Sequence, residues 1–163
     1  MSLSIRQTEE PDAAYLTRWL LQPDVLRFFP MWDVREVEDA VRIWINFAKF
    51  GSAITALWDE QPCGMGLLNL QPFKKLAHQC LISLIVDEQH RNKGVGTALV
   101  EELTQLAKSR FSIEILHLEV YESNPAIRLY RRLGFKEFGC QKHFIKEEGR
   151  YVGKIFMQKE LVH

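Results

Sequence analysis

CLISLIVDEQHRNKGVGTALVEEL, residues 80–103, joins an apolar run typical of a β-strand to a helix through a polar turn that contains Gly94 and Gly96. Backbone N–H groups in the first turn of such a helix lack partners within the helix. Arg91 and Lys93 add positive charge beside them, so the turn is suited to bind a phosphate or a pyrophosphate. The alternative is a strand-to-helix turn that uses glycine only for its backbone geometry.

Two common phosphate-binding loops do not match this turn. The dinucleotide fingerprint requires a third glycine where this sequence has Leu99, and the sequence lacks the Gly-Lys-Ser/Thr of a P-loop. Arg91-Asn-Lys-Gly94-Val-Gly96 matches Arg/Gln-x-x-Gly-x-Gly/Ala after a strand at every specified position. In this it resembles the acyl-coenzyme A loop of the GNAT superfamily of N-acetyltransferases.

Composition limits the kind of protein and its partners. The 163 residues are 47% hydrophobic, which is enough for one domain with a proper core. The 21 basic and 21 acidic residues cancel, so no overall field favours nucleic acid or an anionic membrane as a partner. No apolar run approaches the ~20 residues of a membrane span, and the N-terminus does not read as a signal peptide. We therefore expect a single cytoplasmic domain over residues 1–163.

The three cysteines, Cys63, Cys80 and Cys140, are widely spaced and odd in number. This spacing argues against a disulfide framework and against a zinc site, so we expect reduced thiols and no metal. Cys80 and Cys140 are poor candidates for nucleophiles that carry the acyl group, because the GNAT resemblance implies direct transfer of the acyl group to the acceptor, which needs no such nucleophile.

Hydrophobic periodicity and turn residues predict eleven elements in the order β-α-α-β-β-β-α-β-α-β-β. We expect strands at 4–8, 53–58, 63–70, 78–86, 113–121, 136–146 and 151–161, and helices from Glu10 to before Pro23, from Asp33 or Val34 to about Phe50, after Gly94, and over 126–133. Helices are expected on both faces of the near-continuous apolar strand 78–86.

A second motif, LEVYESNPAIRLYRRLGF, occupies residues 118–135. Asn124 is expected to cap a helix with Pro125 at its first position, and Gly134 to end it. This motif resembles the C-terminal half of the GNAT core, in which a strand is followed by an Asn, a short helix that contains Leu-Tyr, and Gly-Phe. The two motifs occur in the family order and together span roughly 78–135, whereas the first 70 residues resemble the family only in element order.

The resemblance implies an α/β (α+β) fold with a mixed, largely antiparallel sheet that splays between its fourth and fifth strands. Coenzyme A is expected to lie in the V-shaped gap that opens between these two strands. Backbone groups of the strand would bind the pantetheine arm, and amides of the loop would bind the pyrophosphate. The implied cofactor-binding residues are Leu84, Ile85, Val86, Arg91, Asn92, Lys93, Gly94, Val95, Gly96, Thr97 and Asn124.

The resemblance also implies an N-acetyltransferase that moves an acetyl group from acetyl-CoA to a primary amine by direct attack in a ternary complex, without a metal. Tyr130 matches the proton donor to the leaving thiolate, although its ring also continues an apolar helix face. Glu119 is the leading candidate for general base, with an ordinary exposed strand glutamate as the alternative; His117 is a weaker candidate. Asn124 precedes Tyr130 by six residues where the family usually has seven, so either Ser123 takes the Asn position or the turn is tighter.

The acceptor is expected to be a small-molecule amine or a protein N-terminus, because the N-terminal segment and the tail loosely resemble the branch that acts on ribosomal-protein N-termini and small amines. Phe28, Phe29, Trp32 and Trp58 are candidates for the acceptor pocket, or else core residues. Relatives of this kind are often dimers, so a homodimer is possible. Two alternatives are a catalytically silent acyl-CoA sensor and an ATP-binding protein that uses the same loop.

Overall fold

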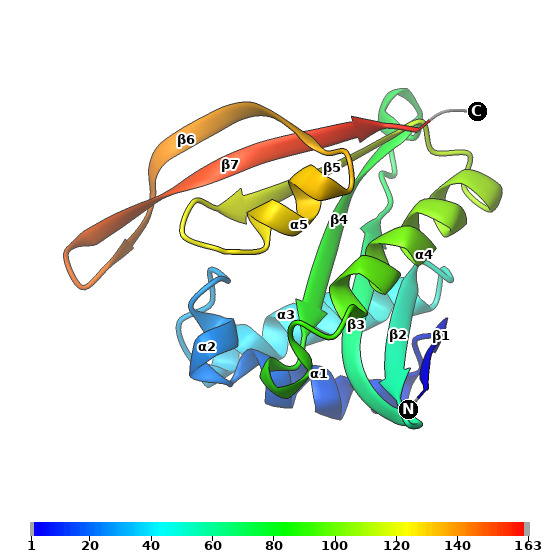
Figure 1. Ribbon diagram of the computed structural model, residues 1–163, viewed down its shortest axis with the longest axis horizontal. Helices are drawn as coiled ribbons and strands as arrows, with labels where there is room; N and C mark the ends of the chain where they lie inside the picture. The colour runs from blue at the N-terminus through cyan, green and yellow to red at the C-terminus, as the bar shows by residue number, and fades with distance from the viewer. Residues whose placement is uncertain (1, 162–163) are drawn as a thin grey trace.

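The computed structural model describes residues 2–161 and places seven strands in one sheet, in the order β1-β2-β3-β4-β5-β7-β6 (Figure 1). The strands are β1 (Leu3–Gln7), β2 (Ala53–Trp58), β3 (Gln61–Asn69), β4 (Gln79–Val86), β5 (Ile115–Tyr121), β6 (Lys136–Glu147) and β7 (Arg150–Glu160). The α-helices are α1 (Ala13–Leu20), α2 (Pro23–Leu26), α3 (Val34–Ala48), α4 (Val95–Ser109) and α5 (Ile127–Arg132), and the 3-10 helices are η1 (Glu10–Asp12), η2 (Lys74–Leu76) and η3 (Glu88–His90).

The sheet is split between β4 and β5. These two strands pair in parallel only over Gln79–Leu81 and Ile115–His117, whereas the other neighbouring strands pair antiparallel. Beyond Leu81, β4 keeps its partner β3 but has no strand on its other side within residues 2–161, and Figure 1 shows β4 diverging from β5 and β7. The mixed, splayed sheet expected from the sequence is confirmed.

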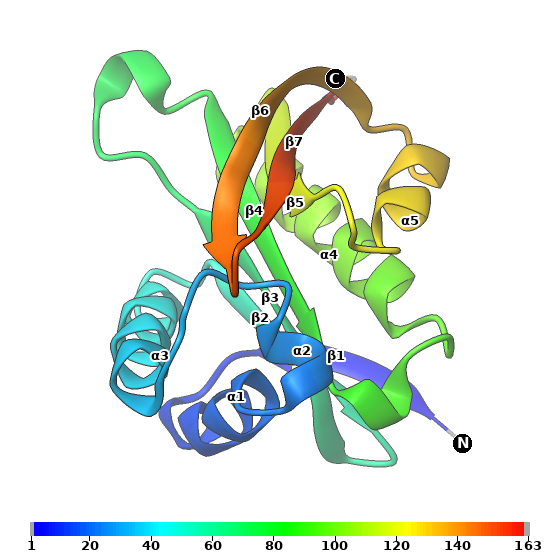
Figure 2. The ribbon, with the colours of Figure 1, turned by 90° about the vertical axis from the view of Figure 1, so that its left-hand side faces the viewer.

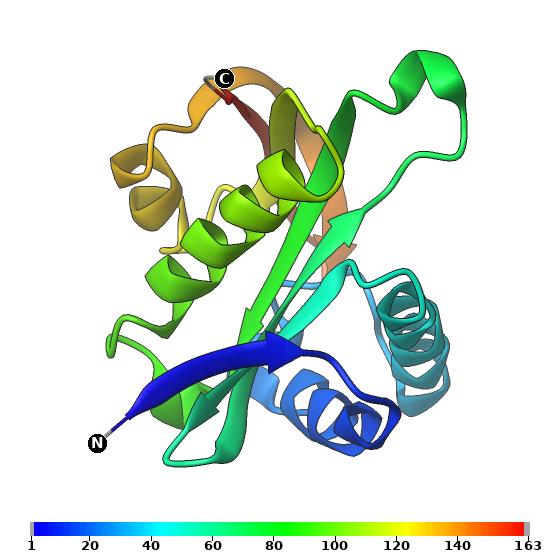
Figure 3. The same cartoon turned by 90° about the vertical axis from the view of Figure 1, so that its right-hand side faces the viewer.

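Helices cover both faces of the β1–β4 half of the sheet (Figures 2 and 3). On one face α1 and α3 pack on Ala53, Met65, Leu67 and Ile85. On the other face α4 packs through Leu99 and Leu103 into a second cluster that continues under α5. At the end of β4, Leu84 and Val86 pack on the α4 side and Ile85 packs under α1 and α3, because side chains on a strand point to opposite faces in turn.

Gly64 and Gly66 on β3 allow α4 to lie close to the sheet. A Cβ at Gly66 would lie 2.8 Å from Leu103 Cδ1, and one at Gly64 would lie 3.2 Å from Leu99 Cδ1 and from Val95 Cγ1. The β2–β3 register also shifts beside Cys63, which is the signature of a β-bulge. The strand therefore contains both a bulge and a close approach of α4.

A buried ionic network ties β1 to the start of α1 and to β2. The Asp12 side chain is 5% exposed and accepts hydrogen bonds from Arg6 Nη1 at 2.7 Å and from Thr55 Oγ1 at 2.9 Å. It also accepts from the backbone N–H of Glu9 at 2.9 Å. Burial alone would raise the pKa of Asp12, but these donors outweigh it and hold the pKa below its usual value.

The first helix ends before Pro23, as expected. Pro23 is also the first residue of α2, a short helix that the sequence did not predict, and its missing N–H costs nothing there. The prediction for the start of the last helix was wrong. Helix α5 begins at Ile127, with Ala126 as its cap. Asn124 Oδ1 instead accepts a hydrogen bond from the N–H of Ala126 at 2.9 Å, which makes a tight turn ahead of the helix rather than a helix cap.

Candidate active site

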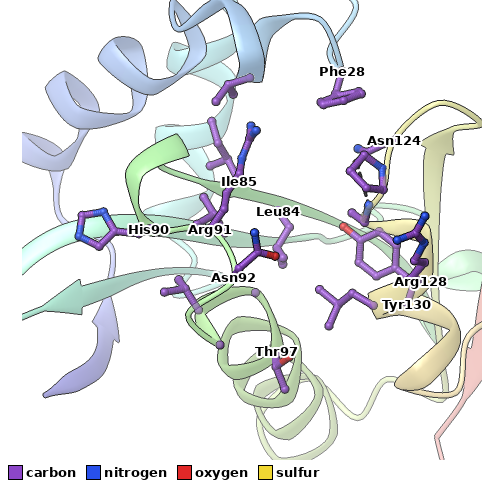
Figure 4. Close-up of a pocket in the computed structure, with 18 of the residues that line it drawn as sticks. Phe28, Leu84, Ile85, His90, Arg91, Asn92, Thr97, Asn124, Arg128 and Tyr130 are labelled. Carbon is purple, nitrogen blue, oxygen red and sulfur yellow. Dashed lines mark hydrogen bonds between the residues drawn. The ribbon is translucent and has the colours of Figure 1, made fainter. Parts of the chain in front are cut away.

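A cleft of about 720 Å³ lies where β4 and β5 separate (Figure 4). Its walls are α2, the free edge of β4, the start of α4, and α5. The lining residues are Val25, Phe28, Phe29, Leu84, Ile85, Val86, His90, Arg91, Asn92, Gly94, Val95, Gly96, Thr97, Asn124, Pro125, Ala126, Arg128, Leu129, Tyr130 and Arg132.

The loop before α4 presents backbone N–H groups to this cleft. Gly94 caps the helix with φ +83°, a left-handed conformation that favours glycine. The N–H groups of Val95, Gly96 and Thr97 have no acceptor in hydrogen-bonding geometry within residues 2–161, as expected for a first helical turn. They form a ready site for an anion.

The edge of β4 contributes a second set of backbone groups. Leu84, Ile85 and Val86 line the cleft on the side where β5 no longer pairs with β4. Because each residue of a strand carries one donor and one acceptor, an open edge accepts an extended ligand as an added strand. The side chain of Ile85 meanwhile packs into the core under α1 and α3, so this edge is held in place from behind.

Helix α5 places Tyr130 on the opposite side of the cleft. Its ring packs edge-on against Phe135, with centroids 6.1 Å apart and planes at 71°. Figure 4 shows its hydroxyl directed toward Leu84, and no hydrogen bond joins that hydroxyl to the other residues drawn there. Burial raises the pKa of Tyr130 to about 12, so the phenol is protonated at neutral pH and can donate.

The α2 side of the cleft is apolar and fixed to the α4 loop. Val25 is 2% exposed and anchors α2 in the core, while Phe28 and Phe29 line the cleft. Arg91 Nη2 donates to the carbonyl oxygen of Asp24 at 2.7 Å.

Gln22, just before α2, forms two further hydrogen bonds with the end of β4. Its Nε2 donates to Asp87 Oδ1 at 3.0 Å, and its Oε1 accepts from the N–H of Glu88 at 3.3 Å. Three contacts therefore join this wall to the segment that presents the anion site.

The charged residues that line the cleft are cationic. Arg91 comes from the loop, and Arg128 and Arg132 come from α5; among residues 2–161 the lining contains no Asp or Glu. Sequence reasoning did not single out Arg128 or Arg132. Their spacing of four residues on a helix, which places both on one face, is the signal that identifies them.

Almost every residue predicted to bind the cofactor lies at this cleft. All of them line it except Lys93, whose Nζ lies over the Trp58 ring at 5.4 Å from its centroid. Of the four aromatic candidates for the acceptor pocket, Phe28 and Phe29 line the cleft. Trp58 and Trp32 do not, and Trp32 is 68% exposed.

Glu119 lies on β5 and is outside the lining of the cleft. Its Oε1 accepts a hydrogen bond from Lys154 Nζ at 2.7 Å, and the Lys154 ammonium also lies 3.7 Å from the centroid of the Phe144 ring. A base role for Glu119 therefore requires its carboxylate to exchange the Lys154 ammonium for the incoming amine. His117 is held neutral, because burial lowers its pKa.

Two of the three thiols have the environment expected of structural cysteines. Cys63 and Cys80 are buried, whereas Cys140 is exposed on β6, and burial raises the pKa of Cys80 to about 12. A thiol with such a pKa is protonated at neutral pH and is a poor nucleophile. Within residues 2–161 no three His, Cys, Asp or Glu side chains group as a metal site would require. No helix in that range is long and apolar enough to span a membrane.

Comparison with known proteins adds independent information. The acetyltransferase (GNAT) family model matches residues 13–135. The N-alpha-acetyltransferase of Sulfurisphaera tokodaii is 40% identical over 81 residues, which are 48% of each chain, so the match spans about half the length of that relative.

Two solved structures align along nearly the whole chain. The ribosomal-protein-alanine N-acetyltransferase of Brucella melitensis has a TM-score of 0.82 at 27% identity and covers 97% of this chain and 99% of its own. YncA of Salmonella typhimurium, solved with its cofactor acetyl-CoA, has a TM-score of 0.83 at 22% identity and covers 99% and 95%. At that identity the second likeness concerns the fold alone.

Proposed function

The chain belongs to the acetyltransferase (GNAT) family, and from this premise we propose that it transfers an acetyl group from acetyl-CoA to a primary amine of a small molecule or a protein N-terminus. One observation carries the proposal. The unpartnered N–H groups that begin α4 and the protonated hydroxyl of Tyr130 lie at the same cleft, on either side of the free β4 edge.

The residues present at this cleft fit acetyl-CoA. The open edge of Leu84, Ile85 and Val86 suits the amide-containing pantetheine arm. The loop from Arg91 to Thr97 offers N–H groups and charge to the pyrophosphate. Membership of the acetyltransferase (GNAT) family supports this choice of cofactor.

Acetyl-CoA supplies an activated thioester, and the protein's own groups position the acceptor and manage protons. Holding an amine beside the thioester replaces a bimolecular encounter with an oriented one, which removes much of the entropic barrier. Tyr130 holds a proton where the leaving thiolate forms. Glu119 is proposed as the base that takes a proton from the incoming ammonium, once its bond to Lys154 is exchanged. The reaction proceeds by direct attack and uses no metal.

Release of free coenzyme A thiol from acetyl-CoA, measured with a panel of primary amines, tests this function. We expect amine-dependent thiol release that persists in EDTA, an acceptor heavier by one acetyl group, and an unmodified protein by intact mass. An acetylated protein intermediate would contradict direct transfer. Cofactor binding without turnover of any amine would instead favour the silent acyl-CoA sensor.

A further inference from the structure

We infer that the acceptor carries its amine on an apolar residue, preferably an aromatic one, and has no second ammonium group. This inference rests on the proposed function and narrows it to a substrate class. Two independent features of the cleft carry it: the composition of its α2 wall and the sign of the charges around it.

The α2 wall is built to contact apolar groups. Phe28 and Phe29 line the cleft beside Val25, and Figure 4 shows Phe28 and Asn124 on either side of its mouth. The contacts of Gln22 and Arg91 hold this wall against the α4 loop before any ligand arrives. A preformed aromatic wall binds an apolar side chain at a low cost in conformational entropy.

The charges around the cleft disfavour an acceptor with several ammonium groups. Among residues 2–161 the lining contains three arginines and no carboxylate. The phosphates of coenzyme A would neutralise Arg91 and the arginines of α5, but the α2 wall itself supplies no carboxylate to the cleft lining. There the Arg27 guanidinium lies 4.7 Å from the centroid of the Phe28 ring. A second ammonium would therefore meet cations without a compensating carboxylate.

Three acidic side chains close to this region are already engaged. Asp24 Oδ1 lies 3.9 Å from Arg27, and Glu119 accepts from Lys154. Asp87 accepts from Gln22 and lies 3.1 Å from His90 Nδ1. None of the three lines the cleft, so none presents a free carboxylate to a polyamine.

Thiol-release kinetics with phenylalaninamide, a tripeptide that begins with phenylalanine, alaninamide and spermidine test the inference. We expect kcat/KM for the phenylalanine acceptors to exceed that for alaninamide and for spermidine by about tenfold or more, as for a side chain that fills an apolar pocket. A comparison of kcat/KM for phenylalaninamide with kcat/KM for the tripeptide distinguishes a small-molecule acceptor from a protein N-terminus.

Substitutions at Phe28 give a second readout. Phe28→Ala should remove most of the preference for phenylalaninamide over alaninamide, and Phe28→Asp should raise the rate with spermidine relative to phenylalaninamide. Phe73→Ala is the matched control, because Phe73 is 69% exposed and lies outside the cleft lining. Thermal unfolding of each variant shows that it is folded.

The outcomes distinguish a failure of this inference from a failure of the proposed N-acetyltransferase function. Thiol release that is fastest with spermidine, or a preference unchanged in Phe28→Ala, would overturn the inference and leave N-acetyl transfer standing. No thiol release with any of these amines, despite acetyl-CoA binding, would overturn the proposed activity and this inference together.

Discussion

Arg91 Nη2 lies 2.7 Å from the backbone carbonyl oxygen of Asp24, so a side chain of the α4 loop holds helix α2 in place. Gln22 adds two hydrogen bonds from the same region to Asp87 and Glu88. The segment proposed to bind pyrophosphate and the wall proposed to contact the acceptor are therefore joined directly. Because Gln22 lies outside the cleft lining, we expect it to act as a positioning residue.

Gln22→Ala should raise KM for the acceptor more than KM for acetyl-CoA. The substitution removes two hydrogen bonds worth about 1 kcal/mol each and so frees α2. A smaller fraction of the protein molecules then holds the α2 wall in the position that binds the acceptor, and we expect the acceptor KM to rise by up to about tenfold. Initial-rate kinetics with each substrate varied in turn measure the split. Gln105→Ala, at an exposed position on α4, is the control. An equal rise in both KM values would show that Gln22 does not act on the acceptor side in particular.

Tyr130→Phe should lower kcat and leave acetyl-CoA binding intact, because it removes one hydroxyl and preserves the ring contact with Phe135. General acids typically contribute about 10²–10⁴-fold, and a loss in that range is expected. Steady-state rates and a cofactor titration measure the two effects. Tyr151→Phe, at an exposed tyrosine, is the control. Equal loss of binding and rate would mean that Tyr130 is structural.

Gly94→Val should abolish acetyl-CoA binding. Gly94 has φ +83°, and no atom lies within 4 Å of the position that a Cβ would take, so the new side chain strains the backbone that presents the α4 amides without meeting a neighbour. Gly149 has φ +76° and equally open surroundings in the β6–β7 turn. Gly149→Val should therefore carry a similar strain of about 1–2 kcal/mol and still bind the cofactor. Calorimetric titration compares the two variants, and equal binding by both would contradict the loop assignment.

Glu119→Gln should lower kcat if the carboxylate takes the proton of the acceptor, with a loss of about 10² or more expected of a general base. The amide keeps the shape of the side chain but removes the basic oxygen that Lys154 now contacts. Glu101→Gln, at an exposed position on α4, controls for loss of charge. Steady-state rates unchanged in Glu119→Gln would place the base elsewhere, or in solvent.

Asp12→Asn should destabilise the fold at neutral pH by about 1–3 kcal/mol, the cost of breaking a buried charged hydrogen bond. Because the pKa of Asp12 is held below its usual value, its contribution is complete above the ordinary aspartate pKa and is lost as pH falls through the folded value. Urea unfolding at pH 7 and near pH 3 should show the difference from the parent shrinking in acid. Asp39→Asn, on the exposed face of α3, should change little at either pH.

The parts of the site that local patterns encode could be predicted from the sequence. Alternating or continuous apolar runs, glycines and the helix signals placed β4, the loop, α4, β5 and α5, and the two motifs located the cleft between them. Tyr130 and the predicted loop residues other than Lys93 line that cleft.

The parts that depend on distant contacts could not be predicted. Gln22 and Asp87 are 65 residues apart, and Glu119 and Lys154 are 35 apart, so no spacing rule connects them. Helix α2 is too short to show a period, and it is anchored by Val25 in the tertiary core rather than by its own sequence. The hydrogen bonds that tie α2 to the loop before α4 and the engagement of Glu119 by Lys154 consequently emerge only in the folded chain.

A thermal-shift titration with acetyl-CoA, coenzyme A and ATP tests the central claim most directly. A ligand at about 100 times its Kd should stabilise the folded protein by roughly 2.7 kcal/mol. We expect both coenzyme A species to raise the Tm and ATP at the same concentration to leave it unchanged. If neither coenzyme A species shifts the Tm, the loop from Arg91 to Gly96 is only a turn, and the acetyltransferase function is contradicted.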